Sequence, residues 1–444
     1  MYYVQKNEYS PLELFQNETT GDRYMVKLLI IADDFTGALD TGVQFAARGA
    51  ATIVVTDLNY DFRSAEKRVE VLVMVAETRH LQPQEAYEIV YSTVHRAFQA
   101  GIAYIYKKTD SALRGNIGSE LTALMDGTGV DTIPFLPAFP KLGRVTREGV
   151  HYVDGVPVAQ SIFGQDPFEP ILNSSVEDIL RQQTKVPVLM HPRKESYKIS
   201  DPGIQVFDAE TDADLKHIAR ELGAEQLRFS AGCAGFAAVL ADMLNLKETA
   251  TELPKLEETL FIACGSVNPV TIRQMKRAQE QGFPHVNLNP VQKLEQNWGD
   301  SKPAGQCVRW WLAEASGKKR FILDVNDPQG CGDTDIYARE HNLTMEQLRV
   351  QISKNLAALI KRMLDNGLKA TLLCTGGDTL MALMQAVDVS ELTPIYEITA
   401  GVVLTNFVYK EKTYYIISKS GGFGEEDLFL KISEIISETS KNIN

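Results

Sequence analysis

Two polar segments in the first half of the chain combine residue types that can bind and activate a small acid. Asp33 and Asp34 follow the apolar run 26–32, which has the length and composition of a buried parallel strand. The segment 107–116 reads K-K-T-D-S-A-L-R-G-N and follows a second apolar run. Carboxylates accept hydrogen bonds from hydroxyl groups or act as bases, and an arginine can hold a carboxylate through two parallel hydrogen bonds. This combination favours a site for a small polyhydroxylated carboxylate.

Three expected strand ends contribute candidate residues to this site. Arg79 follows the apolar run 69–75, so it should emerge at the same edge of a parallel sheet as the two aspartates. Two other interpretations stay open: Asp34 is a suitable N-cap for the helix that follows it, and the charges of 107–116 are also typical of a solvated loop with Asn116 as an N-cap. The patterns select Asp33, Asp34, Arg79, Lys107, Lys108, Asp110, Ser111, Arg114 and Asn116.

Three glycine-containing turns in the second half of the chain follow expected strands and open expected helices. They are 264–269 (C-G-S-V-N-P), 374–379 (C-T-G-G-D-T) and 419–424 (K-S-G-G-F-G). Glycine allows close backbone approach, and the N–H groups at a helix N-terminus bind phosphate oxygens, so three such turns favour a nucleotide site. Lys419 is the candidate cation beside the phosphate, or else an exposed lysine at a strand end. The sequence has no G-x-x-x-x-G-K-[ST] motif, which excludes a P-loop enzyme. It also has no G-x-G-x-x-G motif and no protein-kinase motifs.

Expected strands and helices alternate along most of the chain, which predicts βαβ units. Asp154 and Gly155 predict a tight hairpin within 151–158. In the first half, the expected elements include strands at 26–32, 52–55, 69–75, 102–106 and 132–135 and helices at 83–99 and 117–125. In the second half, they include strands at 259–263, 321–325, 371–374, 396–398 and 413–417 and helices at 269–281 and 345–366.

The length of 444 residues is enough for about two to four domains, and two large ones are the simplest reading. The polar, proline-containing segment 246–258 is the best candidate for a linker. We therefore expect an N-terminal extension at 1–25, an acid-binding domain at 26–245, the linker at 246–258 and a nucleotide-binding domain at 259–444. The predicted fold class is α/β, and each domain should contain a mainly parallel sheet with helices on both faces.

Composition and charge narrow the classes of function. With 45 Lys and Arg against 58 Asp and Glu, the net charge is −13, which disfavours binding to nucleic acid or to an anionic membrane surface. The five cysteines are odd in number and show no C-x-x-C spacing, which argues against a disulfide framework or a structural zinc site. The first 25 residues lack the pattern of a signal peptide, and no apolar run reaches the length of a membrane span. We therefore expect a cytoplasmic protein.

Several segments, taken in order, resemble the four-carbon acid sugar kinase family. They are IADDFTGALDTGVQFAARG, YKKTDSALRGNIGSEL, PAFPKLGRVTREGVHYVDGVPV, GCAGFAA, CGSVNPVT, CTGGDT and SKSGGFGEED, and together they extend from about residue 28 to residue 427. Members of this family have an N-terminal sugar-acid domain and a C-terminal nucleotide-binding domain. They phosphorylate tetronates such as threonate, erythronate or 2-oxo-tetronate with ATP.

The resemblance also implies roles for particular residues. It implies that Asp34, Arg79 and the stretch 110–114, with Ala112 and Leu113, bind the sugar acid. It implies that ATP is bound by Ser266, Gly376, Gly377, Asp378, Thr379, Gly421 and Gly422. Two departures stand out. The usual D-T-x-S-R reads A-E-T-R at 76–79, which leaves the identity of the acid open, and the usual G-S-A-G-L reads G-C-A-G-F at 232–236, which we expect to affect packing only.

The residues and the resemblance together predict an ATP-dependent kinase that phosphorylates a hydroxyl of a four-carbon sugar acid. Asp34 is the first candidate for the carboxylate that activates this hydroxyl, and Asp110 is the second. Arg79 and Arg114 should anchor the carboxylate of the acid, and Lys107 or Lys108 should neutralise the transferred phosphoryl group. Mg²⁺ is expected with ATP, although its ligands are not assigned, and the two domains should close on each other.

Two other classes of function stay open at this point. A hydroxy-acid dehydrogenase that uses NAD(P) would also suit glycines at strand ends, and a non-catalytic sensor of sugar acids would suit the acid site alone. The expected partner is a small-molecule sugar acid, with no nucleic acid and no membrane. Assembly into a homo-oligomer is left open.

Overall fold

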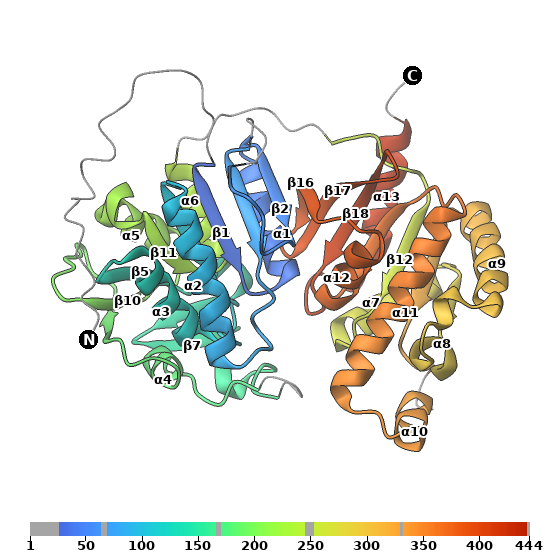
Figure 1. Ribbon diagram of the computed structural model, residues 1–444, viewed down its shortest axis with the longest axis horizontal. Coiled ribbons are helices and arrows are strands. Elements are labelled where there is room, and N and C mark those ends of the chain that lie inside the picture. The colour runs from blue at the N-terminus through green and yellow to red at the C-terminus, as the bar shows by residue number, and fades with distance from the viewer. Residues whose placement is uncertain (1–25, 64–68, 166–169, 245–252, 329–331, 442–444) are drawn as a thin grey trace, which may run out of the picture.

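The computed structural model describes residues 26–63, 69–165, 170–244, 253–328 and 332–441. The predicted N-terminal extension and residues 246–252 of the predicted linker lie outside this part of the chain. We call the elements before the linker the N-terminal lobe and those after it the C-terminal lobe (Figure 1). No helix among the described residues is both long enough and apolar enough to cross a membrane.

The N-terminal lobe contains eight parallel strands. From the outer edge inward, their order is β9 (Val188–His191), β10 (Gly203–Phe207), β5 (Thr132–Leu136), β11 (Phe229–Gly232), β4 (Tyr104–Lys108), β1 (Leu28–Ala32), β3 (Val71–Val75) and β2 (Thr52–Val55). The central strand β1 is fully buried, as its unbroken apolar sequence requires. Because β1 is in register with β3 and β4, Ala32, Val75 and Lys108 end at the same edge of the sheet.

Helices cover both faces of these strands. One face packs against α1 (Phe35–Ala46), α5 (Asp212–Gln226) and α6 (Ala234–Met243), and the other packs against α2 (Pro83–Gln99), α3 (Ile117–Thr128) and α4 (Val176–Arg181). The alternation along β1 explains this division, since Leu28 and Ile30 belong to the first core and Leu29 and Ile31 to the second. The predicted hairpin is present in a separate antiparallel sheet of β6 (Arg144–Arg147), β7 (Val150–Val153) and β8 (Val156–Pro157).

The C-terminal lobe contains seven strands, in the order β13 (His285–Asn287), β14 (Arg320–Asp324), β12 (Leu260–Cys264), β15 (Thr371–Thr375), β18 (Lys412–Lys419), β17 (Val402–Tyr409) and β16 (Glu391–Thr399). The first five are parallel, and the last three form an antiparallel meander, of which the sequence analysis identified only parts. Helices α9 (Lys302–Lys318), α11 (Met345–Asp365) and α12 (Gly377–Ala386) cover one face, and α7 (Pro269–Glu280) and α13 (Leu428–Lys441) cover the other. The short helices α8 (Pro290–Leu294) and α10 (Asp333–Glu340) lie beside α11 at the outer side of the lobe. The prediction of an α/β fold with mainly parallel strands and helices on both faces is confirmed.

The two lobes join through one continuous sheet. β16 pairs antiparallel with β2, where Glu391 and Leu392 lie opposite Val55 and Val54, so the fifteen strands form a single sheet. The sequence predicted two separate sheets and contained no signal for this pairing, because edge strands pair through backbone groups that every sequence has.

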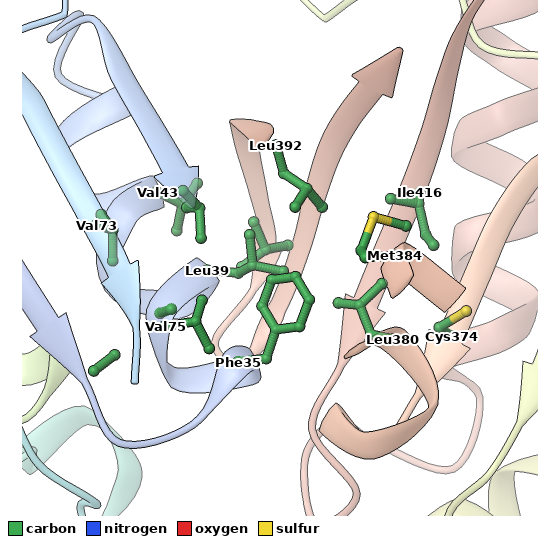
Figure 2. Packing of buried hydrophobic residues seen from close by; sticks show 14 of the residues in the cluster. Phe35, Leu39, Val43, Val73, Val75, Cys374, Leu380, Met384, Leu392 and Ile416 are labelled. Carbon is green, nitrogen blue, oxygen red and sulfur yellow. The ribbon is translucent and has the colours of Figure 1, made fainter. Parts of the chain in front are cut away.

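Helix α1 fills the junction between the lobes. Nine of its twelve residues are buried, since β1 and β3 cover one side and α12 and the β16–β18 meander cover the other. Figure 2 shows Phe35 and Leu39 of α1 pointing toward Leu380 of α12 and Leu392 of β16. These side chains belong to one buried apolar cluster, so the core continues across the junction. Burial of an apolar side chain of this size contributes roughly 1.5–3 kcal/mol to stability.

Candidate active site

Asp33 and Asp34 connect the end of β1 to the start of α1. Asp34 is the N-cap of α1, because its Oδ1 accepts a hydrogen bond from the Gly37 amide at 3.1 Å and its Oδ2 accepts one from the Thr36 hydroxyl at 2.7 Å. A Cβ atom on Gly37 would collide with Asp34 Oδ1 and with the ammonium group of Lys108, so only glycine allows this close approach. Asp34 is therefore both a helix cap and a member of a charged cluster.

Arg79 lies at the centre of this cluster. Its Nη2 atom is 2.9 Å from Asp33 Oδ2, 2.8 Å from Asp34 Oδ1 and 3.6 Å from Asp110 Oδ1. Burial opposes ionisation of Asp33, but the cations Arg79 and Lys108 outweigh this effect and hold the pKa of Asp33 well below its usual range. Arg79, which we expected to anchor the carboxylate of the substrate, already contacts three carboxylates of the chain.

Asp110 and Arg114 form a bidentate ion pair. Arg114 Nε and Nη2 donate to the two carboxylate oxygens at 2.9 and 3.0 Å, and the amides of Ala112 and Arg114 both donate to Asp110 Oδ2 at 3.2 Å. Burial opposes ionisation of Asp110, but Arg114 and Arg79 hold its pKa well below the usual range. A carboxylate with so many donors is a weak base.

Lys107 and Lys108 face opposite sides of the sheet. The sequence predicted a strand at 102–106 with both lysines in the loop after it, but β4 ends only at Lys108. Because successive side chains of a strand alternate, Lys107 faces α3, where its Nζ lies 3.0 Å from Glu120 Oε2. Lys108 faces α1, with its Nζ 3.5 Å from Asp33 Oδ1 and 3.8 Å from Asp34 Oδ1. Of the two lysines, Lys108 is the one that joins the cluster.

Other residues of the segment 110–116 position the loops. Leu113 is buried and has a φ of 67°, which brings the chain around after Asp110. Asn116 occupies the N-cap position of α3 but makes no side-chain capping bond. Its Nδ2 instead donates to the carbonyl groups of Thr78 and Leu81, both at 2.9 Å. Asn116 therefore holds the loop that carries Arg79 against the start of α3.

The small antiparallel sheet contributes two groups that the sequence analysis did not select. Arg144 Nη1 donates to the hydroxyl of Ser111. His151 has its Nε2 2.9 Å from the carbonyl oxygen of Ser111 and its Nδ1 3.0 Å from Thr146 Oγ1. Arg144 does lie in one of the segments that carry the family resemblance, but local patterns contain no signal that a hairpin residue reaches the edge of another sheet.

Glu77 is a third group that the patterns did not select. Burial, followed by the nearby charges of Asp34 and Asp378, raises the pKa of this carboxyl to about 7. Its Oε1 atom is buried without a hydrogen-bond partner among the described residues, and its φ of 49° is unusual for a residue other than glycine. Glu77 thus lies between a carboxylate of the N-terminal lobe and one of the C-terminal lobe.

Two of the glycine turns lie side by side in the C-terminal lobe. The Thr271 hydroxyl, on α7, donates to the carbonyl of Gly421 at 2.7 Å, and a Cβ atom on Gly421 would lie 2.7 Å from Ser266 Oγ. A Cβ atom on Gly422 would have only Asn268 Nδ2 nearby, at 3.6 Å. Gly421 is therefore required by packing of the chain, whereas Gly422 is not.

The third glycine turn opens α12. Gly376 has a φ of 93°, so its conformation favours glycine, whereas Gly377 is the first helical residue. Asp378 accepts a hydrogen bond from Arg349 Nη1 at 2.7 Å, and the side chain of Thr379 is buried. The first amides of α12 have no partners within the helix and suit an anion.

Lys419 is the first residue of the glycine turn 419–424, and its side chain contacts this turn and α7. Its Nζ donates to Thr271 Oγ1 at 2.9 Å and to the carbonyls of Ser420 and Gly421 at 3.1 and 3.0 Å. Burial lowers the pKa of Lys419 to about 7. In this arrangement the lysine supports the backbone of the glycine turn.

The charged cluster of Asp33, Asp34, Arg79, Lys108, Asp110 and Arg114, which we call the acid cluster, meets the glycine turns across the junction. A Cβ atom on Gly377 would lie 3.7 Å from Thr36 Cγ2, so the N-termini of α12 and α1 adjoin each other. Phe423, on the turn after β18, places its ring centroid 5.2 Å from the guanidinium carbon of Arg144. The structure thus brings together Asp33, Asp34, Arg79, Lys108, Asp110, Ser111 and Arg114 on one side and Ser266, Gly377, Asp378, Gly421 and Gly422 on the other.

Two family models match the two halves of the chain. Residues 28–240 match the family model of a sugar-binding N-terminal domain, and residues 261–429 match that of a nucleotide-binding C-terminal domain. The chain is 28% identical to the D-threonate kinase of Salmonella typhimurium, over 90% of this chain and 96% of that protein. It is 26% identical to the D-erythronate kinase of Heliobacterium modesticaldum, over 82% of this chain and 87% of that protein. It is 23% identical to the 3-oxo-tetronate kinase of Haemophilus influenzae, over 90% of this chain and 97% of that protein.

Solved structures share the fold. A protein of Salmonella typhimurium LT2, described as a putative tRNA synthase, aligns with a TM-score of 0.76 and 20% identity over 92% of this chain and 99% of its own. At that identity the similarity concerns the fold alone. The two domain models together match most of the chain, and the relatives that align with nearly all of it are kinases of four-carbon sugar acids. The chain is therefore a sugar-acid kinase and belongs to the four-carbon acid sugar kinase family.

Proposed function

We propose that this kinase transfers the γ-phosphoryl group of ATP to a hydroxyl of a four-carbon sugar acid of the threonate, erythronate or oxo-tetronate class. The transfer takes place at the junction of the two lobes. The observation that carries the proposal is the contact between the start of α1, with Asp34 and Thr36, and the start of α12, with Gly377. An acid held by the cluster and a phosphate held by the α12 amides would then be neighbours.

The residues of the C-terminal lobe fit a nucleotide phosphate. Gly377 and Gly422 leave space where a phosphate oxygen could approach the backbone, and the α12 N-terminus offers amide donors. ATP in kinases carries Mg²⁺, which uses one or two carboxylates together with phosphate oxygens and water. Asp378 and Glu77 are the carboxylates beside this helix that could hold such an ion, whose chemistry is to neutralise charge on the transferred group.

Asp34 is the better candidate for the base that accepts the proton of the hydroxyl. Its side chain is 19% exposed, whereas that of Asp110 is 8% exposed and both of its oxygens are held by Arg114. Lys108, beside Asp34, is the cation on this side of the junction that could approach the phosphoryl group. The chain would thus provide positioning and charge neutralisation, which are the main requirements of phosphoryl transfer.

A coupled assay of ADP release tests this proposal. We expect turnover with ATP, Mg²⁺ and one of D-threonate, D-erythronate or an oxo-tetronate, and no turnover when the acid is omitted. Omission of Mg²⁺ should also abolish turnover. Absence of acid-dependent ADP release across four-carbon acids, together with reduction of NAD(P) by one of them, would favour the dehydrogenase instead. Binding of an acid without turnover of any nucleotide would favour the sensor.

A further inference from the structure

The charged groups of the acid cluster pair almost completely among themselves. Asp33 contacts Arg79 and Lys108, and Asp110 forms its bidentate pair with Arg114. Asp34 also contacts Arg79 and Lys108, and Asp110 also contacts Arg79. Lys107, on the other face of the sheet, pairs with Glu120. The arginines and lysines that the sequence suggested as anchors for an acid are thus already engaged by carboxylates of the chain.

Arg144 differs from these cations. Within the described part of the chain, no carboxylate oxygen lies within 4.0 Å of its guanidinium group, and its Nε is a buried donor without a hydrogen-bond partner. The residue is only 9% exposed. Asp110 attracts this guanidinium only from beyond 4.0 Å. A buried charge that no carboxylate contacts directly is costly, so a site that retains one is suited to an anionic ligand.

The position of Arg144 is defined on three sides. Phe163 and Phe423 place their ring centroids 5.1 and 5.2 Å from its guanidinium carbon, which is the distance of a cation–π contact. On the third side, Ser111 accepts a hydrogen bond from Nη1, and His151 holds the backbone of Ser111. Burial lowers the pKa of His151 to about 4, so its imidazole is neutral at pH 7 and does not repel the guanidinium. The arginine is therefore held in place before any ligand binds.

We propose that Arg144 binds the carboxylate of the acid substrate, and that Phe423 couples this contact to the nucleotide site. The proposal rests on the proposed function, since it names the residue that recognises the acid group of the substrate. The ring of Phe423 belongs to the glycine turn 419–424 of the C-terminal lobe, so a nucleotide that orders this turn also orders the surroundings of Arg144. A carboxylate is favoured over a phosphate because the Arg144 guanidinium donates a hydrogen bond to Ser111, next to Asp110 of the acid cluster, whereas the glycine turn contacts it through the apolar ring of Phe423.

The first experiment compares an acid with its uncharged amide. Calorimetric titrations with D-threonate and with D-threonamide, without nucleotide, measure how strongly the protein prefers the carboxylate. A charge-assisted hydrogen bond corresponds to about 10- to 100-fold in affinity, so Arg144→Ala should weaken acid binding by about that factor and amide binding by less than threefold. Arg144→Lys, which keeps the charge but loses the planar group, should give an intermediate result.

A matched control and a folding control accompany this comparison. Arg147→Ala removes an arginine from the same strand, but that side chain is 53% exposed and faces Glu210, so the ratio of acid to amide affinity should not change. Binding of a non-hydrolysable ATP analogue should stay within about threefold of the wild type in Arg144→Ala, which shows that the C-terminal lobe is intact. An unchanged ratio of acid to amide affinity in Arg144→Ala, or an equal loss for both ligands, would overturn the assignment.

The second experiment tests the coupling. In the wild type, the ATP analogue should tighten binding of the acid, and the acid should tighten binding of the analogue by the same factor. Phe423→Leu keeps an apolar side chain but removes the aromatic face, so this factor should approach one while each ligand alone still binds. A factor that persists in Phe423→Leu would show that the coupling takes another route. If no four-carbon acid binds the wild type, the proposed function itself is wrong, whereas binding that does not depend on Arg144 refutes the present inference alone.

Discussion

Thr36 and Gly377 face each other across the junction of the two lobes, and a Cβ atom on Gly377 would lie 3.7 Å from Thr36 Cγ2. This is an ordinary van der Waals distance, so the glycine is not required by packing of the protein itself. Gly377 also begins α12 and is not among the glycines with positive φ. A requirement for glycine here would therefore arise from a ligand.

Substitution of Gly377 tests whether phosphate approaches the α12 backbone. In Gly377→Ala the added methyl group should displace a phosphate oxygen from one or two amides, which corresponds to about 1.5–3 kcal/mol and hence to about 10- to 150-fold weaker binding of ATP. The melting temperature should stay within a degree or two of the wild type. Titration calorimetry with a non-hydrolysable ATP analogue measures the affinity.

Gly317→Ala is the matched control, because Gly317 lies in α9, has no positive φ, and a Cβ atom there meets nothing within 4 Å. This variant should bind the analogue as the wild type does. If Gly377→Ala changes the affinity less than twofold, the phosphate does not lie against the start of α12.

Asp34→Asn tests the assignment of the base. Asparagine caps helices about as well as aspartate and can accept the same hydrogen bond from Gly37, so the fold should be retained. Loss of a general base typically lowers the rate by 10²–10⁴, and we expect kcat/KM for the best acid to fall within this range. A change of less than about fivefold would show that another group accepts the proton.

Lys107 and Glu120 should act as a structural pair. Lys107→Met leaves the Glu120 carboxylate buried without its cation, which costs roughly 3–5 kcal/mol of stability, while KM for the acid should change little. The double variant with Lys107→Met and Glu120→Leu should recover most of the lost stability, because neither charge remains. Chemical denaturation measures the free energy of unfolding. Lys108→Met, the neighbouring control, should instead impair turnover, and equal kinetic effects of the two lysine variants would contradict this division.

Asp40 should make stability depend on pH near neutrality. Its side chain on α1 accepts a hydrogen bond from the Gly401 amide at 3.3 Å, and burial followed by repulsion from Glu397 raises its pKa to about 7. The usual pKa is near 3.8, so between these values the folded state binds more protons than the unfolded state and stability falls as pH rises. Asp40→Asn should remove this component and raise the melting temperature at pH 8 relative to the wild type.

The measurement is the difference between the melting temperatures of Asp40→Asn and the wild type at pH 5, 6, 7 and 8. The other titrating groups, Glu77 among them, are present in both proteins and cancel in this difference. Asp40→Asn keeps an oxygen that can accept the Gly401 hydrogen bond. A difference that does not grow between pH 5 and pH 8 would show that Asp40 is ionised throughout this range.

Much of the fold was predictable because the signals are local. The apolar run before Asp33 predicts β1, and the expected helix 83–99 has the same bounds as α2. The pairing of β16 with β2 had no such signal, because it depends on backbone groups at strand edges. The boundary of β4 was also wrong, because the buried lysines at its end are polar and only their ion pairs make the burial affordable.

The sequence by itself determined which segments lie at the ends of the parallel strands in each lobe. Parallel strands end at one edge of their sheet, so the polar residues that follow several apolar runs of the N-terminal lobe must lie close together. The glycine turns that follow strands of the C-terminal lobe must lie close together for the same reason. Only the tertiary structure decided which charges pair. Asp33 contacts Arg79 across 46 residues of sequence, and Ser111 contacts Arg144 across 33. Ion pairs depend on distances of a few ångströms between side chains from different elements, and local patterns of sequence do not encode those distances.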